Sequence, residues 1–332
     1  MNIAINGFGR IGRHAFKAIM KKENLDIVAI NDITDNKTLA HLLKYDSTYG
    51  TYDKEVDFDD EGLVVDGKKI KVFEQRDPSE LPWKELNIDV VLECTGIFRT
   101  REAAGKHLDA GAKKVVLSAP GKGDIPMYVR GVNCGKVGEE QSKIIDNASC
   151  TTNCISPVMA VLESKFGVEK AMMSTIHGYT ATQRLLDSPH KDLRRSRAAA
   201  INMIPTTTGA ARSVAKVIPV MDGIFDGFAI RVPLPTVSLV DITLVLKKDT
   251  TKEEINETLV EATKNPIYKG ILAATKKPLV SSDFVGSTYS STVDLALTNV
   301  IGGNLAKVVS WYDNESGYAT RLVEMAELFG KE

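Results

Sequence analysis

The stretch that decides the fold is Asn2–Gly12, which reads NIAINGFGRIG. Its first five residues form a short apolar run typical of a buried β-strand. Gly7, Gly9 and Gly12 follow directly in G-x-G-x-x-G spacing. From Ile11 to Ile19 the apolar residues recur at every fourth position, as on one face of a helix. A strand, a glycine-rich turn and a helix in this order predict the start of a β-α-β unit.

The same alternation continues through the first half of the chain. Strand-like runs occupy residues 27–30, 88–94 and 114–118, and a helical pattern covers Arg101–Asp109. Parallel strands need such helical crossovers. We therefore predict an α/β fold whose first domain, residues 1–149, is a doubly wound parallel sheet of the Rossmann type.

The pattern changes near Ser149. A helical stripe covers Ile155–Phe166, although Pro157 suggests that this helix kinks or begins late. In Val240–Leu246 every second residue is a large apolar one, and the residues between are Asp241, Thr243 and Val245, as in a sheet with unlike faces. These patterns predict an α+β catalytic domain with a mixed or antiparallel sheet at residues 150–312. A helical stripe near the end predicts that a C-terminal helix in residues 313–332 joins the first domain.

Composition excludes several classes of function. The formal net charge of the 332 residues is −1, so neither nucleic acid nor an anionic membrane is expected as a primary partner. No apolar run approaches the roughly 18–20 residues of a membrane span, and the N-terminus does not resemble a signal peptide. Four cysteines in a chain of this length do not resemble a disulfide framework, which favours a reducing, cytoplasmic compartment.

The glycine-rich turn has the context of a dinucleotide site. Asp32 lies 20 residues beyond Gly12, at the end of the second predicted strand. Its carboxylate is expected to bind ribose hydroxyls and to repel a 2′-phosphate, so NAD is favoured over NADP. The alternative is a glycine-rich turn that binds no ligand. The residues predicted here to contact the cofactor are Gly7, Phe8, Gly9, Arg10, Ile11, Gly12 and Asp32.

The segment 149–154, SCTTNC, contains the strongest candidate nucleophile. Cys150 stands where a helical pattern begins, and a helix N-terminus stabilises a thiolate. A buried structural cysteine remains an alternative. A zinc site lacks companion ligands at suitable spacing, and a Cys150–Cys154 disulfide is disfavoured in a cytoplasmic protein.

A second candidate stands in the segment 174–180, STIHGYT. His177 follows a predicted strand, residues 170–176, and is expected on a loop, where it could activate Cys150 and then act as acid and base. A structural histidine is the alternative for a single His. We give that structural interpretation to the other four, which are His14, His41, His107 and His190.

Together with NGFGRIG, the motifs SCTTNC, STIHGYT, PTTTGAA and WYDNESGY make the chain resemble the glyceraldehyde-3-phosphate dehydrogenase family along nearly its whole length. The resemblance implies that Cys150 and His177 are the catalytic pair. It implies NAD-dependent, phosphorylating oxidation of D-glyceraldehyde 3-phosphate to 1,3-bisphosphoglycerate in glycolysis, through a cysteine thiohemiacetal and thioester.

The resemblance also implies further site residues and a homotetramer in which the loop Asp187–Thr208 reaches a neighbouring cofactor site. From the residues themselves, no metal site is expected. Arg194 and Arg197 are expected in solvent or in salt bridges between subunits.

The substrate phosphate is assigned to Thr180, Thr182 and Arg231. The attacking phosphate is assigned to Ser149, Thr151, Arg195, Thr208 and Gly209. The additional cofactor contacts are Arg76, Thr95, Gly96, Ser118, Asn314 and Tyr318.

Two other functions remain open at this point. Erythrose-4-phosphate dehydrogenase shares the scaffold and the Cys/His pair. A non-catalytic protein could use the same groove to bind NAD or RNA, although the candidate catalytic residues and the near-zero net charge argue against it.

Overall fold

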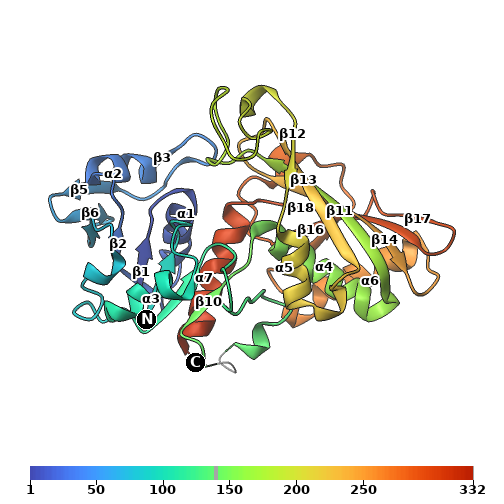
Figure 1. Cartoon of the computed structure of the whole chain (residues 1–332), viewed down its shortest axis with the longest axis horizontal. Helices are drawn as coiled ribbons and strands as arrows, with labels where there is room; N and C mark the ends of the chain where they lie inside the picture. Colours follow the sequence, from blue (N-terminus) through green and yellow to red (C-terminus); the bar gives the residue numbers. More distant parts are fainter. Residues whose placement is uncertain (138–140, 332) are drawn as a thin grey trace. The chain divides into compact units, whose positions relative to one another are not determined.

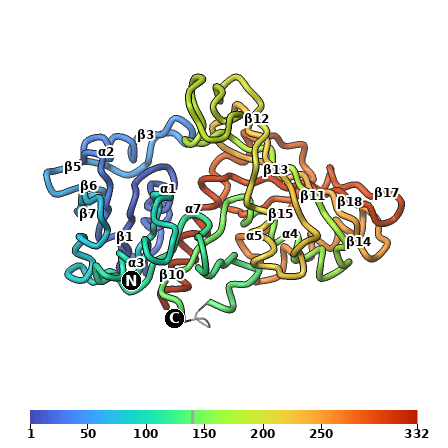
Figure 2. The backbone as a smooth tube through the Cα atoms, in the orientation of Figure 1, coloured from blue at the N-terminus to red at the C-terminus, as the bar shows by residue number. Residues whose placement is uncertain are grey.

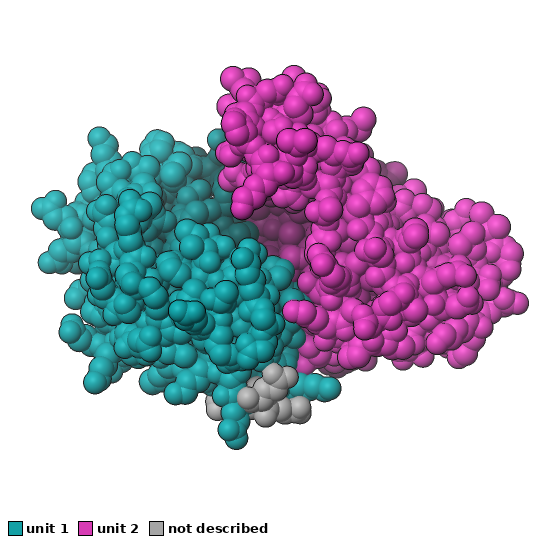
Figure 3. Space-filling view, viewed as in Figure 1, with its two compact units in different colours: residues 1–128, 135–148, 319–332 teal, residues 129–134, 149–318 magenta. Residues whose placement is uncertain are grey.

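A computed structural model describes residues 1–137 and 141–331, and the chain divides into two compact units (Figure 3). Unit 1 consists of Met1–Tyr128, Gly135–Ala148 and Ala319–Glu332. Unit 2 consists of Val129–Cys134 and Ser149–Tyr318. Each unit is built around its own large sheet. In the described part of the chain, no helix has the length and apolarity that a membrane span requires.

Unit 1 contains an eight-stranded sheet in the order β10-β9-β8-β1-β2-β7-β6-β5 (Figure 1). The six strands from β10 to β7 pair in parallel, which confirms the predicted doubly wound sheet. The strands are β1 (Asn2–Asn6), β2 (Asp26–Asn31), β5 (Val56–Asp59), β6 (Gly62–Val65), β7 (Lys68–Phe73), β8 (Val90–Glu93), β9 (Lys114–Leu117) and β10 (Ile144–Asp146).

Helices cover both faces of this sheet. Ala104 of α3 packs with Val91 and Val115 in one hydrophobic cluster. On the other face, the end of α7 lies against the sheet, because a Cβ added at Gly330 would be 3.1 Å from Val90. The helices are α1 (Arg10–Ile19), α2 (Asn36–Lys44), α3 (Arg101–Asp109) and α7 (Ser316–Lys331), of which the last belongs to unit 1 from Ala319 onwards.

The strand order reverses at β1. The chain runs from β1 outward through β2 and β7, and later from β8 outward through β9 and β10. In open α/β sheets, ligands bind at the carboxyl ends of the strands at such a switch point. Gly7 follows β1 there, and Thr95 comes two residues after β8.

The far edge of this sheet differs from the prediction. Strands β5, β6 and β7 form an antiparallel meander, which was not among the predicted elements. Its alternation is interrupted by charged residues and tight turns at Asp60 and Asp66, so the pattern in this segment is weak. A small two-stranded sheet lies beside it, formed by β3 (Tyr45–Asp46) and β4 (Gly50–Thr51).

Unit 2 contains a mixed sheet in the order β12-β13-β11-β14-β18-β16-β15, as predicted, and β17 pairs with β18 (Figure 2). Only β11–β13 and β15–β16 pair in parallel. The strands are β11 (Val168–Gly178), β12 (Ile204–Thr207), β13 (Phe225–Val232), β14 (Ser238–Leu246), β15 (Leu272–Thr275), β16 (Ser291–Asp294), β17 (Asn299–Ile301) and β18 (Leu305–Tyr312).

The alternation predicted at Val240–Leu246 is confirmed. Val240, Ile242 and Leu244 are fully buried in the core of unit 2, whereas the residues between them are only partly buried. Three helices pack over this inward face, with α4 contacting α5, α6 and four strands. They are α4 (Cys150–Phe166), α5 (Ala210–Val217) and α6 (Lys252–Lys264).

The beginning of α4 corrects one expectation. The helix starts at Cys150 and continues without a break to Phe166, with Pro157 inside it. Proline lacks an N–H group and so removes one intrahelical hydrogen bond. Most of the other helix residues are nevertheless buried in unit 2, and this tertiary packing outweighs the local cost of the proline.

The segment 187–209 is more ordered than its composition indicated. It contains the short strand β12 on the edge of the sheet, where Pro205 is tolerated. Within the described residues, the short 3-10 helices are η1 (Pro78–Glu80), η2 (Cys134–Lys136), η3 (Ala199–Ile201), η4 (Pro219–Met221), η5 (Pro266–Tyr268) and η6 (Ser281–Phe284).

Candidate active site

The glycine turn of unit 1 has the geometry that a pyrophosphate requires. Gly7 adopts φ +91°, a conformation that only glycine enters freely. A Cβ at Gly12 would lie 2.2 Å from the Gly7 carbonyl oxygen, so helix and strand pack too closely for any side chain. At Gly9, by contrast, nothing lies within 4 Å of the position that a Cβ would take, which leaves the backbone open to a ligand.

The N-terminus of α1 is suited to an anion. Its N-cap is Gly9, so no side chain caps the first turn, and that turn contains no acidic residue. The first N–H groups of a helix have no intrahelical partners, and the helix dipole attracts negative charge there. Arg10 and Ile11 provide these groups. The residues therefore fit the diphosphate of a dinucleotide.

Asp32 is oriented by backbone groups. Phe8 N–H donates to its Oδ2 at 2.6 Å, and Thr34 N–H donates to its Oδ1 at 3.0 Å. The carboxylate is thereby fixed beside the glycine turn, where a ribose would follow the phosphates.

The other predicted cofactor residues of unit 1 lie in segments that follow the strand ends. Thr95 approaches Gly7 so closely that a Cβ at Gly7 would be 2.8 Å from the Thr95 nitrogen. Gly96 adopts φ +70°, and Ser118 N–H donates to the Glu93 carbonyl oxygen at 2.9 Å. Arg76 is exposed and comes three residues after β7.

Cys150 is the first residue of α4. Ser149 is the N-cap, and its hydroxyl accepts from Thr152 N–H at 3.1 Å. The Cys150 Sγ lies 3.5 Å from His177 Nε2, within hydrogen-bonding reach for sulfur. The helix N-terminus favours negative charge on this sulfur.

His177 lies within a strand, which corrects the expectation of a loop. It is the penultimate residue of β11, and its Cα pairs with Arg231 on β13 and Ser238 on β14. The residue is 4% exposed, and Nδ1 is 2.6 Å from the Gly178 carbonyl oxygen. That oxygen can only accept, whereas the Arg231 guanidinium, 2.8 Å from Nδ1, can only donate, so the two contacts favour opposite states of Nδ1. We assign the ring proton to Nδ1 because the contact with Gly178 is the shorter one and Arg231 has the same oxygen as an acceptor. The lone pair of Nε2 then faces the Cys150 sulfur.

Arg231 adjoins this pair. Its Nη1 lies 2.8 Å from His177 Nδ1 and donates to the Gly178 carbonyl oxygen at 3.0 Å. Burial and the Arg231 charge lower the pKa of His177 to about 3, so the imidazole is neutral near pH 7. The charge of Arg195 also lowers this pKa and that of Arg231, so the positive charges of both guanidinium groups act on the same region.

Opposing influences act on the Cys150 thiol. Burial raises its pKa, whereas the Arg231 charge and hydrogen bonds from Thr151 lower it. Burial favours the neutral thiol, whereas Arg231 and the helix N-terminus favour the thiolate. Where the thiol is neutral, His177 Nε2 is the base beside it. Nε2 can then take the thiol proton as the sulfur attacks.

Tyr312 is a member of this site that was not predicted from the sequence. Its hydroxyl lies 2.8 Å from Thr151 Oγ1 and 3.0 Å from Thr175 Oγ1, and its ring packs edge-on at 6.0 Å from His177. Burial raises the pKa of Tyr312, so it stays protonated. The signal that the sequence offers is that Tyr312 stands at the end of a strand, β18. However, a pattern of alternating residue types along a strand does not distinguish a side chain of the active site from one of the hydrophobic core.

The proposed anion ligands not yet described lie at residues 180–182, 195 and 208–209 of unit 2. Thr180 and Thr182 follow β11, and their hydroxyls are 2.9 Å apart. Arg195 Nε donates to Thr206 Oγ1 at 2.8 Å. The N-cap of α5 is Gly209, and the preceding Thr208 hydroxyl accepts from Ala210 N–H.

Asn314 and Tyr318, the two cofactor residues proposed near the C-terminus, belong to unit 2. Ser238 Oγ donates to Asn314 Oδ1 at 3.1 Å and accepts from Gly178 N–H at 3.3 Å. This contact fixes the amide, with its Nδ2 group left for another acceptor. Tyr318 is buried.

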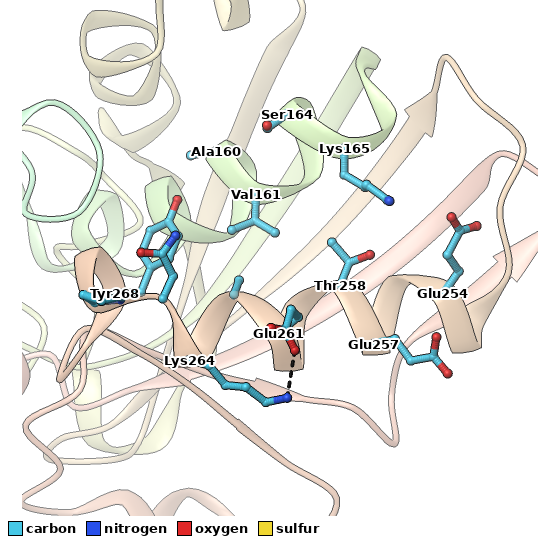
Figure 4. A pocket seen from close by; sticks show the side chains of 13 residues that line it. Ala160, Val161, Ser164, Lys165, Glu254, Glu257, Thr258, Glu261, Lys264 and Tyr268 are labelled. Atoms are coloured by element: carbon cyan, nitrogen blue, oxygen red, sulfur yellow. Dashed lines mark hydrogen bonds and ion pairs between the residues drawn. The ribbon is translucent and has the colours of Figure 1, made fainter.

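Other candidate features lie apart from this constellation. Arg197 forms an ion pair of 2.8 Å with Asp187 of the same chain. A groove of about 960 Å³ between α4 and α6 contains none of the predicted site residues, and its Lys264 pairs with Glu261 at 2.8 Å (Figure 4). In the described residues, no group of three or more His, Cys, Asp or Glu is arranged to hold a metal ion.

Each of the two units contains a region that matches a known protein family. The NAD-binding domain of glyceraldehyde 3-phosphate dehydrogenase matches residues 1–101, and the C-terminal domain matches residues 149–314. The chain is 53% identical to glyceraldehyde-3-phosphate dehydrogenase of Geobacillus stearothermophilus over 326 residues, 98% of this chain and 97% of that protein.

Two further relatives are similar over the same extent. The protein of this name from Borreliella burgdorferi is 53% identical over 98% of this chain and 99% of its own length. Chloroplastic glyceraldehyde-3-phosphate dehydrogenase A of Zea mays is 52% identical over 99% of this chain and 82% of its own length. With a dinucleotide turn in one unit and a Cys/His pair in the other, this chain belongs to the glyceraldehyde-3-phosphate dehydrogenase family of NAD-dependent oxidoreductases.

Proposed function

We propose that this protein oxidises D-glyceraldehyde 3-phosphate to 1,3-bisphosphoglycerate with reduction of NAD, as a step of glycolysis. The observation that carries the proposal is the partly buried contact of 3.5 Å between Cys150 Sγ and His177 Nε2 at the start of α4. A nucleophile in contact with an oriented base is the arrangement that covalent catalysis requires.

In this mechanism the sulfur bonds to the aldehyde carbon, and its proton passes through His177 Nε2 to the carbonyl oxygen, which gives a thiohemiacetal. NAD, when bound, supplies the acceptor for the hydrogen and electron pair that leave this carbon. Nε2 then takes the hydroxyl proton, and a thioester to Cys150 remains. The Cys150 N–H group at the helix start stabilises negative charge on the substrate oxygen.

Inorganic phosphate completes the reaction. Its oxygen attacks the thioester carbon, the C–S bond breaks, and the sulfur recovers the proton from Nε2, while the proton of the hydrogen phosphate passes to solvent. Thr180, Thr182 and Arg231 are proposed to bind the substrate phosphate. Guanidinium and hydroxyl groups are typical phosphate ligands. The attacking phosphate is assigned to Ser149, Thr151, Arg195, Thr208 and Gly209.

The test is an assay of NAD reduction with glyceraldehyde 3-phosphate, with and without phosphate. We expect rapid reduction that depends on phosphate. A higher kcat/KM with erythrose 4-phosphate and no dependence on phosphate would instead assign the protein to erythrose-4-phosphate oxidation. NAD binding without turnover of either aldehyde would indicate a non-catalytic role.

Cofactor preference provides a separate prediction. In Asp32→Gly, a 2′-phosphate no longer meets the carboxylate that the N–H groups of Phe8 and Thr34 hold in place. We expect the ratio of kcat/KM for NADP to that for NAD to rise on the order of tenfold or more. Steady-state kinetics with both cofactors measures it. Asp35→Gly, three residues away at the N-cap of α2, serves as the control, and an unchanged ratio in Asp32→Gly would remove the ribose contact.

We also propose that the protein is a cytoplasmic homotetramer. Leu193 and Ile201 in the segment 187–208 are 80% and 81% exposed in the single chain, a state that favours association. All four cysteines are free, as suits a reducing compartment. Sedimentation velocity tests the assembly, and a monomer at micromolar concentration would contradict it.

A further inference from the structure

Four polar residues of unit 1 stand immediately before segments assigned to the cofactor. Asn6 precedes Gly7, Asn31 precedes Asp32, and Gln75 precedes Arg76. Glu93 ends β8, two residues before Thr95. The two asparagines and Glu93 are at most 4% exposed. Burial of this many polar groups is costly unless each is hydrogen-bonded.

The four residues are connected to one another. Asn31 Nδ2 donates to Asn6 Oδ1 at 2.7 Å and to the Gln75 carbonyl oxygen at 2.9 Å. Gln75 N–H donates to Asn31 Oδ1, also at 2.9 Å. Asn6 Nδ2 donates to Glu93 Oε2 at 2.5 Å. One chain of hydrogen bonds therefore crosses the carboxyl ends of β7, β2, β1 and β8, which are neighbours in the sheet.

Glu93 is the centre of this network. Its Oε1 accepts from both the N–H group, at 2.8 Å, and the hydroxyl of Thr95. Its Oε2 accepts from Asn6 and lies 3.1 Å from His107 Nε2. Four donors thus surround one carboxylate, two at each oxygen. An ionised carboxylate has about four lone-pair sites, so all of its acceptor positions are used. Loss of the carboxylate leaves at least one buried donor without a partner.

His107 ends the network and has a defined tautomer. Trp83 Nε1 can only donate, and it lies 3.1 Å from His107 Nδ1, so Nδ1 carries the lone pair and Nε2–H donates to Glu93. Both rings are completely buried. His107 was predicted from the sequence to have a structural role, and these contacts show the hydrogen-bonding partners through which it would have that role.

We propose that Glu93 is a positioning residue for the dinucleotide, acting through the buried network Asn31–Asn6–Glu93–His107–Trp83. The network sets the positions of four separate cofactor segments relative to one another. This proposal rests on the proposed function in one respect, which is the assignment of those four segments to NAD binding. Binding energy is lost when ligand groups are displaced by a fraction of an ångström.

Glu93→Gln tests the proposal with little change of shape. An amide cannot accept from all four donors. We expect the Kd for NAD, measured by calorimetry, to rise on the order of tenfold, with kcat at saturating NAD changed by less than about threefold. The rate of Cys150 alkylation without NAD should be unchanged, because that group belongs to unit 2.

Val91→Ala is the matched control. Val91 is buried in the same strand but packs in the hydrophobic cluster. It should lower stability and leave the Kd within about twofold of wild type. If Glu93→Gln and Val91→Ala raise the Kd equally, loss of stability alone explains the effect and the proposal is wrong.

A second test uses Asn31→Ala, which by itself covers the case of a Glu93→Gln protein that fails to fold and otherwise completes a double-mutant cycle with it. Asn31→Ala is separated from Glu93 by Asn6, and it alone should raise the Kd severalfold. In the double variant, the combined increase should be smaller than the product of the single increases, because both changes interrupt one network. Multiplicative effects, or no effect of Asn31→Ala, would overturn the proposal.

Trp83 provides a spectroscopic measurement. We expect its ¹⁵N indole resonance, distinguished from that of Trp311 by Trp311→Phe, to shift when NAD is added. The shift should be lost in Glu93→Gln at saturating NAD. Wild-type protein that fails to bind NAD would overturn the cofactor assignment itself, whereas normal binding without any Trp83 shift would overturn the network.

Discussion

Cys150→Ser is expected to reduce phosphate-dependent NAD reduction on the order of 10⁴-fold or more, equivalent to about 5 kcal/mol of transition-state stabilisation. Serine retains the position at the start of α4, but its hydroxyl is far less acidic than a thiol and is a weaker nucleophile. An oxygen ester is also a poorer acyl donor to phosphate than a thioester. Initial rates with saturating glyceraldehyde 3-phosphate, NAD and phosphate measure the loss.

The Kd for NAD should stay close to the wild-type value in this variant, since the glycine turn and Asp32 belong to unit 1. Cys134→Ser is the control for general effects of removing a thiol. Cys154 is not expected to substitute for Cys150, because burial raises the pKa of its thiol to about 12 and Ser291 accepts its hydrogen bond. Retention of more than a few per cent of the wild-type rate, or no acylated Cys150 in a trapped reaction, would contradict the thioester mechanism.

Most of the fold follows from local patterns. The order of apolar runs and glycines around Gly7–Gly12 predicts the β-α-β start, and Gly7 and Gly12 each stand where a Cβ would collide with neighbouring backbone. The alternation at Val240–Leu246 predicts a sheet with one buried face because side chains of a strand point alternately to opposite sides. In both cases the signal lies within about ten residues of sequence.

The errors concern features set by tertiary contacts. His177 was expected on a loop because Gly178 and Tyr179 follow it, yet pairing with both β13 and β14 extends the strand to Gly178. Pro157 is tolerated in α4 because the surrounding residues are buried on several sides. Neither effect can be seen in a local pattern of residue types.

The electrostatics of the site were the least predictable part. The sequence suggested both Arg231 and His177, but only the parallel pairing of β11 and β13 places the guanidinium 2.8 Å from the ring. That contact, together with burial, lowers the pKa of His177, which favours the neutral ring as a base. Glu93 and His107 were also missed as a pair, because residues 14 positions apart meet through the sheet.

His177→Asn is expected to lower kcat by a factor on the order of 10²–10⁴, the range typical for loss of a general acid–base. Asparagine preserves polarity at this position, but it cannot shuttle protons between the sulfur and the substrate oxygen. Alkylation of Cys150 by iodoacetamide near neutral pH should slow on the order of tenfold, because no base removes the thiol proton. His41→Asn, at an exposed position of α2, is the control for both measurements.

The same variant should change the response of the protein to acid. The pKa of His177 is about 3 in the folded protein against 6.5 ordinarily, so between these values only the unfolded chain binds the proton. Stability from this group is present above pH 6.5 and is lost as the pH falls towards 3. His177→Asn lacks this loss, so its free energy of unfolding should decline less between about pH 6.5 and about pH 4. Urea titrations across this interval measure the difference, and parallel declines in the two proteins would mean that folding does not lower the pKa of His177.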